Sequence, residues 1–161
     1  MAAIEFSLIV SFATVGSLNV ADLAVYARDR LEVENSAAMG AEAAIRTCNA
    51  SQVPATTNCP GLNAAMTAAV QSTGLGTSIS LASGYPKEGY YCVDPNTGVL
   101  TYVSDVSSKP ANCTAVGASY NTPGDYVEVQ TKFTYAPLFP GITVTGAFPG
   151  TITKNAWMRV A

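Results

Sequence analysis

The chain contains no histidine, the side chain that most often serves as general base, as transition-metal ligand and as partner of a serine or cysteine nucleophile. This absence excludes catalysis by a Ser-His-Asp triad or a Cys-His pair. Chemistry based on lysine, glutamate or tyrosine is not excluded, but no motif calls for it. The sequence therefore predicts no catalytic residue, no cofactor and no metal site, and we expect a protein that is not an enzyme.

Charge is also scarce. Charged residues make up 12% of the 161 residues, against about 25% in a typical soluble domain. The net charge is −3 and the basic residues are scattered along the chain. Nucleic acid is therefore not an expected partner, because its binding needs a concentrated basic patch. A composition with so little charge is unusual for a cytosolic protein.

The longest uncharged apolar run directly follows an acid. Residues 6–21 carry no charge, and as a helix they extend about 24 Å, slightly less than the bilayer core of about 30 Å. A carboxylate at the head of such a run is costly unless a cation meets it. For Glu5 the nearest cation is the α-amino group of Met1, on the same chain or on a neighbouring copy. This predicts a chain that resides in a membrane and then stacks on copies of itself, and the alternative is an interfacial acid without a partner.

The helical pattern continues well beyond this run, with many strong helix formers and no proline. We predict one helix from about residue 2 to about residue 47, about 70 Å long, which is too long to be buried in one small domain. In this interpretation 1–27 is the membrane or filament-core half and 28–161 is the globular head. Asp22 is expected either to pair with Arg28 of its own or a neighbouring helix or to mark the outer headgroup boundary.

After the long helix the apolar pattern changes to short elements. A short helix is expected near 61–73, after which the apolar residues alternate with a period of two. Strands are expected at 90–93 and 99–103, which form a hairpin, and at 126–135, 142–145 and 152–160. The predicted class is α+β: a long protruding N-terminal helix with a C-terminal antiparallel β-sheet packed on its second half.

The four cysteines are Cys48, Cys59, Cys92 and Cys113, at spacings of 11, 33 and 21 residues. They lack the C-x-x-C pairs of a zinc site. An even number beyond an apolar anchor predicts disulfides formed in an oxidising compartment. Three pairings are possible, and we expect Cys48–Cys59 and Cys92–Cys113 because they close the shortest loops, each contributing roughly 3 kcal/mol. Four free buried thiols are the alternative.

Four parts of the chain carry a resemblance to a known family. Ala3-Ile4-Glu5-Phe6 resembles the start of a mature type IV pilin, with its acid at the fifth position. Residues 20–26 resemble the stretch that ends the apolar run in TadE-like chains, and 37–41 resemble their small-residue helical segment. At the other end, 135–141 and 155–160 resemble their closing Pro-Leu-Phe-Pro turn and final strand. The chain thus resembles a tight-adherence (Tad) TadE-like pilin at both ends, whereas its middle matches no known pattern.

The resemblance implies a structural subunit of an extracellular type IV pilus on a bacterial cell surface. A prepilin peptidase would remove a basic leader and expose Met1, often N-methylated, as the new terminus. A cytoplasmic ATPase and a membrane platform would then extract subunits from the inner membrane into a helical homopolymer. Glu5 would set the register. The filament core would be formed by apolar side chains of the same run: Phe6, Leu8, Ile9, Phe12 and Val15.

Two other functions stay open at this point. The chain is alternatively a minor pilin, an adhesin or a membrane-tethered binding module that does not itself form a filament. A small extracytoplasmic enzyme on an anchor is the third possibility, with the least support because of the missing histidine. The acid favours the filament, because a simple tether has no use for Glu5 in its anchor.

Overall fold

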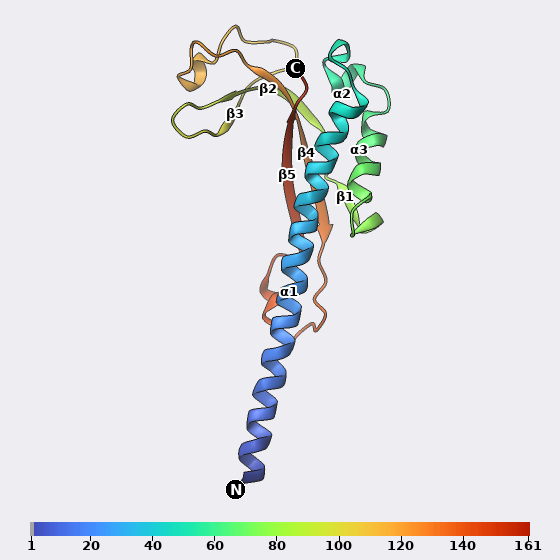
Figure 1. The fold of residues 1–161 in the computed structure, drawn as a ribbon, viewed down its shortest axis with the longest axis vertical. Helices are drawn as coiled ribbons and strands as arrows, with labels where there is room; N and C mark the ends of the chain where they lie inside the picture. Colours follow the sequence, from blue (N-terminus) through green and yellow to red (C-terminus); the bar gives the residue numbers. More distant parts are fainter. Residues whose placement is uncertain (1) are drawn as a thin grey trace.

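The computed structural model describes residues 2–161 (Figure 1). One long helix leads into a head made of short helices and a five-stranded sheet. The helices are α1 (Ala2–Thr47), α2 (Ala55–Asn58) and α3 (Leu62–Gln71), with single 3₁₀ turns at η1 (Ala50–Gln52), η2 (Gly76–Ser78), η3 (Thr114–Val116) and η4 (Val144–Ala147). The strands are β1 (Ile79–Leu81), β2 (Lys87–Val93), β3 (Leu100–Asp105), β4 (Gly124–Thr134) and β5 (Thr151–Arg159).

The long helix has the bounds that the sequence predicts. α1 spans 46 residues without interruption, because it has no proline and because its only glycines are isolated ones that a helix tolerates. Its second half packs against α3, β4 and β5, whereas its first half projects away from the head (Figure 1). The α+β class with a long N-terminal helix and an antiparallel sheet is therefore confirmed.

The sheet is organised around β4, its longest strand. β5 pairs along one edge of β4 from Tyr126 to Thr134. Two strands share the other edge: β2 pairs with residues 124–128, and β1 pairs with residues 131–133. β3 continues the sheet beyond β2 as the predicted hairpin. All these pairings are antiparallel, so one face of a continuous sheet is available to the helices.

The core lies between α1 and the sheet. Small residues along one stripe of α1 allow the close approach, since Ala37, Ala41 and Ala44 are all buried there. Ala41 and Ala44 pack with Val127 and Val129 of β4, which alternate onto the inner face. The helix–sheet contact therefore depends on small side chains, which let two backbones come close.

Two disulfides tie the loops of the head to its core. Cys48 at the end of α1 is bonded to Cys59, and Cys92 in β2 is bonded to Cys113. This is the pairing that the loop lengths predict. The alternative of four free thiols is wrong, because no cysteine is left unpaired.

The strand expected at 142–145 is absent, and this prediction is wrong. The segment forms a turn followed by the 3₁₀ turn η4. Pro140 lacks an N–H for a ladder, and Gly141 takes a positive φ of 79° that turns the chain. The hydroxyls of Thr143 and Thr145 are directed at α1 instead of alternating across a sheet.

Candidate assembly surface and its junction with the head

The first part of α1, residues 4–17, is an exposed apolar segment, here called the arm. From Ile4 to Ser17 every described side chain is exposed, and Phe12 reaches 77%. Within residues 2–161, α1 is the one helix long and apolar enough to cross a membrane. The predicted filament-core side chains all lie exposed on this arm: Phe6, Leu8, Ile9, Phe12 and Val15. Such a surface requires either lipid or other protein around it.

The polar side chains of the arm bond to the helix itself. The hydroxyls of Ser11, Thr14 and Ser17 each donate to the carbonyl oxygen four residues earlier, at 2.8–2.9 Å. Asn19 Nδ2 donates to the carbonyl of Val15 in the same way, at 2.8 Å. The donor groups of these four side chains are therefore satisfied within the helix, which is what an apolar environment demands. Asn19 Oδ1 in addition accepts a hydrogen bond from the backbone N–H of Val144 in the head. The serines and the threonine therefore do not prevent the arm from lying in an apolar environment.

Glu5 is exposed on this arm, among apolar side chains. The two ion pairs that the described residues form, Arg46–Glu42 and Lys154–Glu34, both lie in the head half of the molecule. The expected cation, the α-amino group of Met1, lies outside the described residues. A contact between Glu5 and that group, within one chain or between copies, therefore stays a prediction.

The junction between arm and head is built around Asp22. Its side chain is 0% exposed, although it lies only one residue beyond the uncharged run. The Tyr135 hydroxyl donates to Oδ1 at 2.7 Å, and the backbone N–H of Leu138 donates to the same oxygen at 2.9 Å. The hydroxyls of Thr143 and Thr145 both donate to Oδ2. Four donors thus satisfy both carboxylate oxygens, and the segment after β4 is bound to α1.

These contacts correct the expectation for Asp22. The pairing with Arg28 of the same chain is wrong, because both oxygens of Asp22 are occupied by donors from residues 135–145. Burial raises the pKa of Tyr135, and its hydrogen bond to the carboxylate of Asp22 raises it further, so the hydroxyl keeps its proton as donor. The sequence held one usable signal: Thr143 and Thr145 alternate in an otherwise apolar segment without charge.

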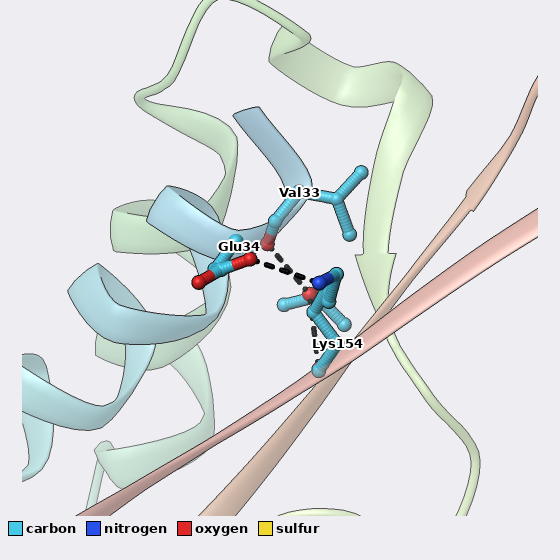
Figure 2. Close-up of polar contacts among 4 residues, drawn as sticks. Val33, Glu34 and Lys154 are labelled. Carbon is cyan, nitrogen blue, oxygen red and sulfur yellow. Dashed lines mark hydrogen bonds and ion pairs between the residues drawn. The ribbon is translucent and has the colours of Figure 1, made fainter. Parts of the chain in front are cut away.

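A second polar contact between α1 and the sheet lies C-terminal to Asp22 on the same helix. Lys154 Nζ of β5 lies 2.9 Å from Glu34 Oε2 of α1 (Figure 2). The hydrogen bond and charge of Lys154 hold the pKa of the Glu34 carboxyl below its usual value. A groove runs along this side of α1 toward the arm, between the helix and the segment before β5. Its lining mixes apolar and charged side chains: Leu23, Tyr26, Ala27, Arg30, Leu31, Glu34, Phe148 and Lys154.

The outer face of the sheet carries aromatic side chains that the helices do not cover. Tyr91 packs edge-on against Tyr102 and Tyr126, with ring centroids 5.5 and 5.8 Å apart. Trp157 of β5 is exposed on this face. Beside them Glu128 accepts hydrogen bonds from Asn155 at 2.8 Å and from the Tyr91 hydroxyl at 3.4 Å. Fixed polar groups next to exposed rings are a surface suited to binding.

Comparison with models of protein families, with curated proteins and with solved structures finds no match for this chain.

Proposed function

We propose that the chain is the structural subunit of an extracellular type IV, Tad-like pilus of a bacterium. It would reside in the inner membrane through the arm of α1 and then enter a helical filament of identical copies. The single observation that carries this proposal is the exposed, uncharged arm with one acid, Glu5, near its tip. The disulfide-bonded head fits the same location, because structural disulfides persist in oxidising compartments.

The hydrophobic effect alone does not distinguish membrane from filament. Burying one large apolar side chain is worth about 1.5–3 kcal/mol, so Phe6, Leu8, Ile9, Phe12 and Val15 together gain roughly 8–15 kcal/mol when they leave water. Lipid tails and neighbouring helices provide this gain about equally. A chain can therefore move from one environment to the other at small cost, and some other group must define how neighbouring helices align.

Glu5 is the group that can define this alignment. An ionised carboxylate among apolar side chains is strongly unfavourable unless a cation or several donors reach it. In the proposal its partner is the α-amino group of Met1 of the same or an adjacent copy. Desolvation offsets much of the attraction in such a pair. The pair therefore fixes the relative height of neighbouring helices more than it stabilises the filament.

The test compares two variants that each remove one negative charge from α1. Glu5→Gln is expected to abolish filaments while the protein still accumulates in the membrane fraction. Glu42→Gln is the matched control, since Glu42 is exposed on the head half of α1, where it pairs only with Arg46. Electron microscopy of sheared surface appendages and immunoblots of membranes give the two readouts. Normal filaments from Glu5→Gln would overturn the role of this carboxylate.

The proposal includes the partners that the pilin resemblance implies. A prepilin peptidase would produce Met1 as the terminus, and a membrane platform with a cytoplasmic ATPase would supply the work of extraction. The protein itself would act by self-association and not as an enzyme. Deletion of the platform protein should trap the chain in the inner membrane, with the disulfides of the head already formed.

A membrane-tethered adhesin or minor pilin is the second candidate. The uncovered aromatic face around Trp157 and Tyr102 favours it, because a face of this kind offers a ligand stacking and hydrogen bonding at once. Trp157→Ala tests the binding role of this face, and microscopy of the wild-type chain separates the two candidates. Loss of surface adhesion with intact filaments would add a binding role to the subunit. Surface display of the wild-type chain without filaments would replace the first proposal by the second.

A further inference from the structure

An uncharged segment of the head lies beside α1 where the helix leaves the head. Residues 133–153 carry no charged side chain, and within them the connection from β4 to β5 passes through η4. Figure 1 shows this connection, in orange to red, alongside the blue part of α1 and below the rest of the head. Three of its large side chains are exposed: Leu138, Ile142 and Val144 are 53%, 56% and 59% exposed.

This connection is held at a fixed height on the helix. The carboxylate of Asp22 binds it through the donors described above, from Tyr135 to Thr145. One turn lower on the helix, Asn19 Oδ1 accepts a hydrogen bond from the backbone N–H of Val144 at 2.8 Å. Phe148 also packs against Tyr26 of α1, with ring centroids 4.9 Å apart. With these groups directed at the helix, Leu138, Ile142 and Val144 are left exposed.

The segment contacts α1 at the position along the helix where the uncharged run ends. Residues 6–21 extend about 24 Å, and a bilayer core is about 30 Å thick. A run of this length ends near one face of the hydrocarbon core, so the part of the chain beside Asp22 lies at the membrane interface. Val20 and Leu23 of α1, which are exposed at the same level, continue the apolar surface toward the segment.

We propose that residues 138–148, here called the collar, are a second lipid-contacting element that lies in the outer interface of the membrane beside α1. The inference rests on the membrane-resident stage of the proposed function. Lipid is the occupant because the collar is uncharged and continuous with the apolar arm. The irregular backbone of the collar keeps it at the interface, where water and headgroups can satisfy its polar groups, and out of the hydrocarbon core. The collar thereby sets how deeply the arm inserts.

The test uses tryptophan as a depth reporter in the full chain. A Trp157→Phe background removes the single native tryptophan. Ile142→Trp and Val144→Trp report on the collar, and Phe12→Trp reports on the arm. Val99→Trp is the matched control, an exposed apolar position in the β2–β3 turn at the far end of the head (Figure 1). Each variant is reconstituted in vesicles of phosphatidylcholine and phosphatidylglycerol, with the phosphatidylcholine brominated at a chosen chain depth.

The collar variants are expected to lose most of their fluorescence when bromine is near the glycerol end of the chains. Phe12→Trp should lose most with bromine near the methyl end, and Val99→Trp should lose none. Collar tryptophans that behave like Val99→Trp while Phe12→Trp is quenched would overturn the collar but not the membrane stage. An unquenched Phe12→Trp would overturn both. A blue shift of the collar emission that grows with the protein-to-lipid ratio, without quenching, would assign the collar to a second copy and overturn the lipid contact.

Discussion

The buried carboxylate of Asp125 predicts an uncommon pH dependence of stability. Asp125 is the second residue of β4, and its side chain is 1% exposed on the inner face of the sheet. Among the described residues, neither of its carboxylate oxygens has a hydrogen-bond partner. Burial, together with the negative charge of Glu88, raises the pKa of Asp125 from 3.8 to about 6, and the positive charge of Lys109 opposes this only in part.

The sign of the effect follows from which state holds the proton. Between pH 3.8 and about 6 the folded chain keeps a proton on Asp125 that the unfolded chain has released. The contribution of this group to stability is therefore largest at low pH and is lost as the pH rises through about 6. A pKa difference of about 2 corresponds to about 3 kcal/mol of unfolding free energy.

Asp125→Asn removes the charge and keeps the shape. The difference in unfolding free energy between wild type and variant is expected to change by about 3 kcal/mol from pH 3 to pH 8, in favour of the variant at the higher pH. A constant cost of burying the amide cancels in this comparison. Guanidinium unfolding of the detergent-solubilised chain, followed by circular dichroism across the pH series, measures the difference.

Asp105→Asn is a control of opposite sign. Hydrogen bonds from Ser107 lower the pKa of Asp105 below 3.8, so the wild type should gain on this variant only as the pH rises toward 3.8, and the comparison should stay nearly constant at higher pH. The reasoning is refuted if the comparison for Asp125→Asn stays flat over the same range. Asp125 would then ionise in the folded chain as readily as in the unfolded one, which requires a partner or solvent at its oxygens.

Two further substitutions test the packing of α1 and the attachment of the collar. A Cβ at Gly40 would lie 2.8 Å from Cγ2 of Val70, so Gly40→Ala is expected to lower the unfolding free energy by about 1–3 kcal/mol in denaturant titrations. Gly16→Ala, which meets open space, should not lower it. Asp22→Asn replaces a full acceptor by a group with its own donors, so hydrogen exchange of residues 138–148 should accelerate while that of β5 does not. Unchanged exchange in the collar would contradict its attachment through this carboxylate.

The elements that the sequence predicts well depend on local pattern. The bounds of α1 follow from helix formers without proline, and the β2–β3 hairpin follows from alternation around a glycine turn. The disulfides follow from short loop closure. In each case the determining residues are near one another in the chain, so one sequence is sufficient. The helix α3 also lies within the predicted 61–73.

The features that sequence analysis missed depend on contacts between distant residues. The donors to Asp22 come from 113 to 123 residues later in the chain, and no local pattern links them. Proximity in sequence predicts that Asp22 pairs with Arg28. A buried carboxylate, however, is satisfied by the donors that the fold brings to it. The burial of Asp125 was not predicted for a related reason. The alternation of apolar residues begins after Asp125, whereas β4 begins before it.

The contrast between the two acids of α1 supports the division of the helix. Glu5 and Asp22 lie about 25 Å apart along the helix, and both border the same uncharged run. Asp22 receives four donors from its own head and needs no other molecule. Glu5 lies on the part of the helix that the head does not reach, so in an apolar environment its counter-ion must come from the chain terminus or from another copy. The head thus satisfies one carboxylate by folding and leaves the other exposed, which fits the role in assembly that we propose for Glu5.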